Sequence, residues 1–185
     1  MNRIAVFQFI YTNYKTFLFN NLKKILLLSD THSYIDDRII HYVKAADEVW
    51  HAGDIGDLRV TDMIEEHAPL RGVYGNIDND KARVTFPLHQ RFSCEKVSVW
   101  MTHIGGYPPK YNIHTREEIK TNPPKLFICG HSHILKVIPD KKNGVLHMNP
   151  GAAGKHGFHK VRTMLRFTLH LGAIENLEVI ELGKK

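Results

Sequence analysis

The sequence is poor in cysteine and has no long apolar run. Its two cysteines, Cys94 and Cys129, lie far apart and match neither a disulfide framework nor a zinc-binding spacing. We therefore expect a reducing compartment and predict a cytoplasmic protein. No stretch of about 20 consecutive apolar residues is present, so no membrane span is predicted. Internal repeats and low-complexity tracts are missing as well, which is typical of an ordinary globular chain.

Positive charge is in excess but is not gathered in one place. The chain carries 25 Lys and Arg against 19 Asp and Glu, a formal net charge of +6. The basic residues are scattered and several stand beside acids, whereas a nucleic-acid footprint would cluster them on one face. We therefore do not expect nucleic acid as a partner.

The length of 185 residues suits a single domain. Residues 1–23 stand apart as an aromatic-rich extension with apolar side chains at helical spacing. An interfacial amphipathic helix, an extra packing element and a misassigned start all fit this segment, so its role stays open. We assign residues 24–185 to one domain.

The pattern of apolar residues predicts an α/β fold. Continuous apolar runs followed by segments of helical periodicity give the order β-α-β-α-β, which implies parallel strands with helical crossovers. In the second half we expect further strands, a short helix and two sheets with helices outside. The predicted strands are 23–30, 47–53, 70–76, 91–95, 96–103, 125–130, two within 134–149, 161–170 and 175–182. The predicted helices are 35–46, 58–67 and 115–122.

A side chain able to bind a metal follows each of several predicted strands. The carboxyl ends of strands are where α/β folds place their sites. The pairs in "SDTHS" and "GHSHI" are spaced i, i+2, and in an extended segment such residues point to the same side. These side chains are Asp30, His32, Asp54, Asn76, His103, His131 and His133.

The number and type of these side chains indicate two metal ions. Oxygen and nitrogen ligands without thiolate suit Mn, Fe, Ni, Co or Zn better than Ca or Mg. Seven ligands exceed the needs of one ion. A carboxylate shared between two ions about 3.5–4 Å apart accounts for the number and is an arrangement used in phosphoryl transfer.

The ordered motifs Asp-x-His, "GDIGD", "GNID", the His103 strand end and "GHSH" resemble the calcineurin-like metallophosphoesterase superfamily. The short chain and the "NPGA" at residues 149–152 are similar to its small single-domain phosphodiesterase branch, which includes the retromer scaffold subunit. The resemblance covers about residues 24–182. It implies a four-layer α/β/β/α sandwich of two mixed sheets flanked by helices.

The resemblance also implies a dinuclear metal site with Mn as the expected ion. The nucleophile would be a metal-bridging hydroxide that attacks a phosphodiester in line. Asp54, Asn76 and His103 would take part in catalysis as well as in metal binding. The first ion would be held by Asp30, His32 and His133, the second by Asn76, His103 and His131, and both by Asp54.

One position departs from the family pattern. Many relatives have a histidine after the asparagine, which is thought to protonate the leaving group, whereas this chain has Ile77. Losing a general acid typically lowers the rate by ~10²–10⁴-fold when the leaving group is poor. We therefore expect diesters, or esters with acidic leaving groups, to be preferred over ordinary phosphomonoesters.

The loop "GAAGKHGFHKVR" is a further candidate. Its Lys155, His156 and His159 could grip a substrate phosphate, although a plain basic loop explains them as well. Asp57 is expected to orient a metal ligand.

The sequence leaves three alternative functions: a metal-dependent phosphodiesterase, a protein-interaction scaffold on the same fold, and a Mn-dependent nuclease. The resemblance leaves a homo-oligomer open.

Overall fold

The structure, a computed structural model, describes residues 22–185. The predicted extension 1–23 therefore lies almost wholly outside the described residues. Within the described part of the chain, no helix is both long and apolar enough to cross a bilayer.

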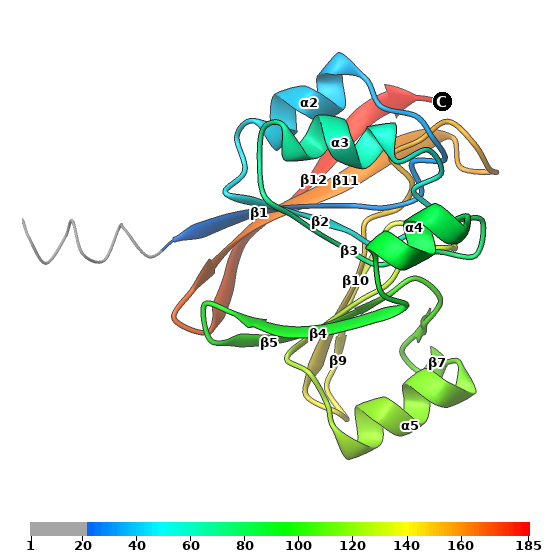
Figure 1. Cartoon of the computed structure of the whole chain (residues 1–185). Helices are drawn as coiled ribbons and strands as arrows, with labels where there is room; N and C mark the ends of the chain where they lie inside the picture. Colours follow the sequence, from blue (N-terminus) through cyan, green and yellow to red (C-terminus); the bar gives the residue numbers. More distant parts are fainter. Residues whose placement is uncertain (1–21) are drawn as a thin grey trace, which may run out of the picture.

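Two five-stranded mixed sheets face each other at the centre of the molecule (Figure 1). In the first sheet β1, β2 and β3 are parallel, β11 pairs antiparallel with β1, and β12 pairs antiparallel with β11. In order across the sheet its strands are β12 (Ala173–Lys184), β11 (Val161–His170), β1 (Lys23–Leu28), β2 (Glu48–His51) and β3 (Leu70–Gly72).

In the second sheet the three central strands are parallel and both edge strands are antiparallel. In order its strands are β4 (His89–Cys94), β5 (Val97–Thr102), β8 (Leu126–Ile128), β10 (Val145–Asn149) and β9 (Lys136–Asp140). A small separate ribbon joins β6 (Gly106–Tyr107) to β7 (Lys110–Tyr111).

Helices close the two outer faces. Figure 1 shows α2 (Asp37–Val43) and α3 (Arg59–Glu65) over the first sheet and α5 (Ile113–Thr121) against the second. The predicted four-layer α/β/β/α sandwich is thus confirmed.

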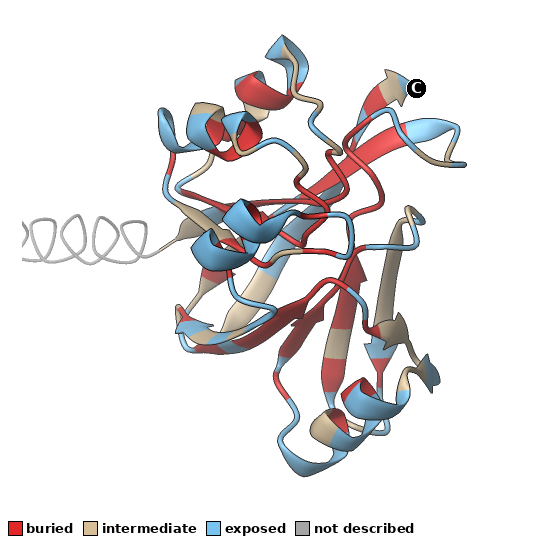
Figure 2. Ribbon diagram, turned by 45° about the vertical axis from the view of Figure 1, so that its right-hand side comes forward, coloured by how far each residue is buried: buried red, intermediate tan, exposed pale blue. Residues whose placement is uncertain are grey.

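The side chains of β1 point alternately to two buried faces of the sheet, which explains why its apolar run is continuous. Ile25 and Leu27 belong to the core between the two sheets, whereas Leu26 and Leu28 pack under α2 and α3. All four side chains are buried, as expected for a strand that is covered on both faces. Figure 2 shows the same pattern: buried residues gather in the central strands, and the outer faces of helices are exposed.

The register of the parallel strands brings their carboxyl ends together. Leu28 of β1 pairs with His51 of β2, and His51 pairs with Gly72 of β3. In the second sheet, Met101 of β5 pairs with Ile128 of β8. The segments that follow these parallel strands therefore start at the same end of each sheet.

Several elements differ from the prediction, among them the β6–β7 ribbon, which was not expected. Helix α4 (Asp80–Thr85) was not expected, although the Asn79 side chain caps it by accepting a hydrogen bond from the Ala82 N–H. Strand β3 ends at Gly72 rather than reaching residue 76, because the Tyr74 N–H donates to the carbonyl of Pro87 instead of a strand neighbour.

Candidate metal centre

The strand ends bring the predicted ligands together in two groups. The first group contains Asp30, His32, Asp54 and His133, and the second contains Asp54, His103 and His131. Within each group one donor atom per residue lies within 4.8 Å of the others. Asp54 belongs to both groups.

Two buried polar atoms in these groups have no hydrogen-bond partner in the described chain. They are Oδ1 of Asp30 and Nε2 of His103. The other ring nitrogen of His103, Nδ1, donates to the carbonyl of Ala52 at 2.8 Å, which leaves Nε2 facing Oδ1 of Asp54 at 3.2 Å. Unpaired buried polar groups are unfavourable, and a ring held in this way is typical of a metal-binding histidine. The residues present therefore fit a metal ion.

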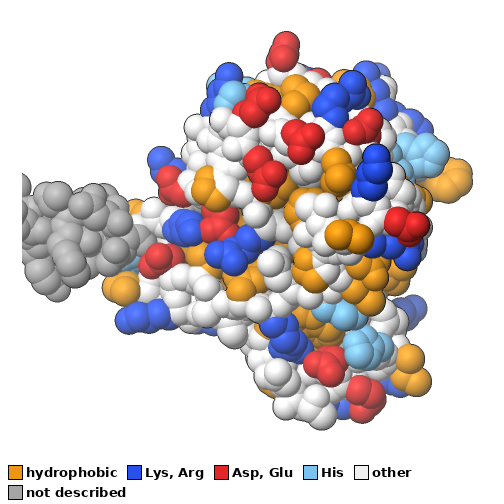
Figure 3. All heavy atoms as spheres, viewed as in Figure 1, with side chains coloured by type: hydrophobic (Ala, Val, Ile, Leu, Met, Phe, Trp, Pro, Cys, Tyr) orange, Lys and Arg blue, Asp and Glu red, His pale blue; other side chains and the backbone are white. Residues whose placement is uncertain are grey.

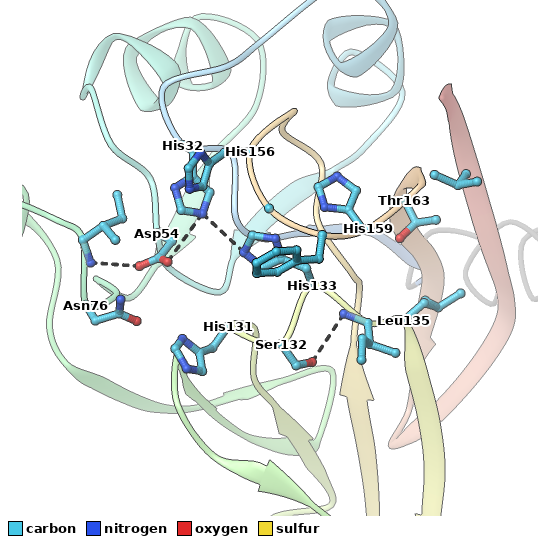
Figure 4. A pocket seen from close by; sticks show the side chains of 15 residues that line it. His32, Asp54, Asn76, His131, Ser132, His133, Leu135, His156, His159 and Thr163 are labelled. Carbon is cyan, nitrogen blue, oxygen red and sulfur yellow. Dashed lines mark hydrogen bonds and ion pairs between the residues drawn. The ribbon is translucent and has the colours of Figure 1, made fainter. Parts of the chain in front are cut away.

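The histidines of the first group converge on the two carboxylates. His133 Nε2 lies 3.2 Å from Oδ1 of Asp30, and His32 Nε2 lies 3.6 Å from Oδ2 of Asp54. The two Nε2 atoms are 3.3 Å apart. Figure 4 shows both rings beside Asp54, with His131 and Asn76 on the other side of the carboxylate.

Burial and neighbouring charge shift the pKa values of these groups. Burial lowers the pKa of His32 and of His131, which favours the neutral imidazole that binds metals. Burial alone would raise the pKa of Asp54, but its interaction with His103 outweighs this and holds the pKa below its ordinary value. Asp54 is therefore ionised at neutral pH.

The ligand loops have left-handed backbone conformations. The φ angles are 54° at Asp30, 46° at His32, 55° at Asp54, 68° at His131 and 56° at His133. The sequence argument assumed extended i, i+2 pairs, and that geometry is wrong. Left-handed turns aim the side chains instead, at a cost of roughly 1–2 kcal/mol per residue.

Two glycines allow close approach to the carboxylates. A Cβ on Gly75 would lie 2.1 Å from Oδ1 of Asp54, and one on Gly130 would lie 2.9 Å from Oδ2 of Asp30 and 2.0 Å from the Ser29 hydroxyl. Side chains at these positions would displace the loops that carry the ligands.

Asp78, whose role the sequence did not reveal, fastens two of these loops. Its buried carboxylate accepts hydrogen bonds from the N–H groups of Ile55, Gly56 and Gly75. The sequence feature that could have indicated this role is that Asp78 is the acid of the "GNID" motif. Asp57, which was expected to orient a ligand, is exposed and accepts from the N–H of Arg59.

The buried His51 links the loops that follow β1 and β2 through hydrogen bonds. The Gly53 N–H donates to Nδ1 of His51, so the proton of the neutral ring is on Nε2, which donates to the Thr31 hydroxyl at 2.9 Å. That hydroxyl donates to the carbonyl of Ile55. Burial lowers the pKa of His51 to about 4, so the ring stays neutral and this chain of hydrogen bonds persists at neutral pH.

Replacing Asp78 with asparagine should destabilise the fold by about 2–4 kcal/mol, because three N–H groups lose a charged acceptor. Urea unfolding monitored by circular dichroism measures this. The control is Asp80→Asn at the exposed start of α4, for which a loss below about 1 kcal/mol is expected. Equal losses for the two variants would contradict the assigned role.

A pocket of about 790 Å³ opens over the two groups. It is lined by Asn76 and by His156 and His159 of the predicted substrate loop. The ring of His156 lies 4.7 Å from that of His32, and the ring of His159 lies 5.4 Å from that of His133. The Lys155 ammonium does not line this pocket; it lies 4.6 Å from the centre of the Tyr34 ring.

Ile77 also lines the pocket, and it contacts the site through its backbone. Its N–H donates to Oδ1 of Asp54 at 3.1 Å, while its side chain is half-exposed at the pocket wall. Position 77 thus offers an apolar surface to the pocket.

Comparison with known proteins places the chain in a family. The model of the calcineurin-like phosphoesterase superfamily domain matches residues 24–172, and the chain belongs to this superfamily. A probable metallophosphoesterase of Mycoplasma pneumoniae is 29% identical in an alignment of 164 residues that covers 84% of this chain and 96% of that protein.

Solved structures share the fold. Vps29 of Chaetomium thermophilum superposes with a TM-score of 0.67 and 15% identity, over 88% of this chain and 99% of that one. A structure described as a novel archaeal phosphodiesterase has a TM-score of 0.64 and 20% identity, over 86% and 99%. The family membership indicates a phosphoric ester hydrolase that uses divalent metal ions.

Proposed function

We propose that this protein is a phosphodiesterase that depends on two divalent metal ions, most suitably Mn²⁺ by its oxygen and nitrogen ligands. The observation that carries the proposal is the position of Asp54 in both donor groups, which lets one carboxylate serve two ions. The first ion would be held by Asp30, His32 and His133, the second by Asn76, His103 and His131, and both by Asp54.

Bound ions of this kind activate water and neutralise charge on a phosphoryl group. The protein fixes the geometry for this chemistry. The Asp54 carboxylate is held by the Ile77 N–H, and His103 is held by the carbonyl of Ala52. His156 lies beside His32 and His159 lies beside His133 in the same pocket, where they would contact the non-bridging oxygens of a substrate.

The side chain of Ile77 cannot donate a proton to a leaving group. We therefore propose that substrates are diesters or esters with acidic leaving groups. A cytoplasmic location is proposed from the reduced state expected of Cys94 and Cys129. Association into a homo-oligomer is also proposed from the resemblance to this branch of the superfamily.

The test is Mn²⁺-supplemented hydrolysis of bis-p-nitrophenyl phosphate and p-nitrophenyl phosphate, together with calorimetric metal titration. We expect two bound Mn²⁺ ions and faster hydrolysis of the diester. His131→Ala should remove one ion and lower activity by at least about 10²-fold, while the exposed His67→Ala should match the wild type. Hydrolysis of neither ester would refute the proposal.

A scaffold role is the second candidate, because Vps29 structures share this fold. One such structure, from Entamoeba histolytica, is described as complexed with Zn²⁺, so metal binding alone does not separate the candidates. Metal binding without hydrolysis in the ester screen would favour the scaffold. Cleavage of DNA with Mn²⁺ would favour a nuclease, yet on the face in Figure 3 basic side chains are interspersed with acidic ones.

A further inference from the structure

The pocket has two unlike ends. One end holds the metal-binding groups with His32, Asp54 and His131. In Figure 4, Leu135 and Thr163 lie on the far side of His133 from Asp54. The apolar side chains of the pocket that do not belong to the metal end, here called the apolar wall, are Ile134, Leu135, Phe158 and Val161.

Much of the apolar wall is exposed to solvent. Phe158 is fully exposed, Ile134 is 57% exposed and Val161 is 39% exposed. Apolar side chains gathered beside a polar site commonly mark a surface that a ligand covers. They come from two segments, 134–135 and 158–161, that are far apart in the sequence, so local chain structure alone does not account for their meeting at one cavity.

The size and charge of the pocket indicate what would lie there. Ligand pockets typically span about 300–1,000 Å³, and 790 Å³ far exceeds the needs of a single phosphoryl group. Among the described residues that line it there is no Lys, Arg or Glu, and Asp54 is the one acid. No Lys or Arg side chain lines the apolar wall, and the nearby Lys185 ammonium donates to the carbonyl of Gly157. An uncharged apolar group would therefore fit against this wall.

We propose that the apolar wall binds the organic substituent of the phosphodiester, an uncharged aromatic or branched aliphatic group, while the phosphoryl group lies at the metal end. This inference rests on the proposed phosphodiesterase function and names its substrate class. Ile134, Val161 and Phe158 are then specificity residues. Ile77, whose N–H donates to Asp54, lines the same pocket at its metal end.

Two diesters with the same leaving group test the proposal. Phenyl p-nitrophenyl phosphate and methyl p-nitrophenyl phosphate both release p-nitrophenolate, so they differ only in the substituent that stays on phosphorus. The measured quantity is the ratio of their kcat/KM values. Comparing this ratio between variants cancels the intrinsic difference in reactivity between the two esters.

The double variant Ile134→Ala and Val161→Ala should lower the phenyl-to-methyl ratio by about 5–10-fold, because apolar area is lost from the wall. The matched control is Ile113→Ala with Val84→Ala, which truncates the same residue types at positions 73% and 89% exposed outside the pocket. Its ratio should equal that of the wild type.

A binding measurement separates failure of this inference from failure of the proposed function. Calorimetry with diphenyl phosphate and dimethyl phosphate needs no turnover. Tighter binding of diphenyl phosphate, weakened in the wall variant and not in the control, supports the inference even if neither ester is hydrolysed. Hydrolysis of both esters with a ratio unchanged in the wall variant, or equal binding of the two phosphates, would overturn it.

Discussion

Asp54→Asn is expected to lower kcat/KM for bis-p-nitrophenyl phosphate by about 10³-fold or more. The residue belongs to both donor groups, so an amide in its place weakens the binding of two ions at once. Metal ions contribute several kcal/mol of charge stabilisation in phosphoryl transfer, and this corresponds to about three powers of ten in rate. Asparagine retains the shape of the side chain, so the fold should persist.

The measurement combines steady-state kinetics with the number of Mn²⁺ ions bound per chain. We expect this number to fall from two in the wild type to one or none. Asp57→Asn is the matched control, because Asp57 is the other carboxylate of "GDIGD" and is exposed away from the donor groups. Unchanged kinetics and two bound ions in Asp54→Asn would contradict the bridging role.

Gly75→Ala is expected to lower activity by about 10²-fold without removing any ligand. The new Cβ would lie 2.1 Å from Oδ1 of Asp54 and 2.4 Å from its backbone nitrogen, so the loop itself must shift. Displacements of about 1 Å at a catalytic site can lower rates by this factor. Overpacking at this buried contact should also destabilise the fold by about 1–3 kcal/mol.

Kinetics and urea unfolding on the same preparation test this prediction. The control is Gly144→Ala in the turn between β9 and β10, where φ is +69° and no atom lies within 4 Å of the added Cβ. The control should lose about 1 kcal/mol of stability through backbone strain and retain full activity. Gly75→Ala with activity within twofold of the wild type would show that the loop tolerates the displacement.

Much of the fold could be predicted because its strands carry a strong signal. Ile25 through Leu28 are all apolar because β1 is covered on both faces, so the strand stands out as a continuous run. Helix α4 was missed because Ala82 is its one buried residue, and a helix without an apolar stripe has no periodic signal. Its asparagine cap was the remaining evidence.

For the candidate site, the sequence showed which residues meet but not how. Ordered motifs at strand ends identified the side chains that the structure brings into two groups. The left-handed turns could not be read, because Asp30 and His133 have sequence neighbours that fit an extended chain equally well. The approach of His156 and His159 was also beyond local patterns, since a loop more than 100 residues after His32 supplies them.

The left-handed turns also restrict which amino acids can occupy the ligand positions. Outside glycine, the residues most often found at positive φ are asparagine, aspartate and histidine. Aspartate and histidine are also the oxygen and nitrogen donors that the two groups offer at Asp30, His32, Asp54, His131 and His133. Backbone conformation and coordination chemistry thus select the same few amino acids. During evolution, a glutamate or cysteine at these positions would be disfavoured by the turn before any metal was bound.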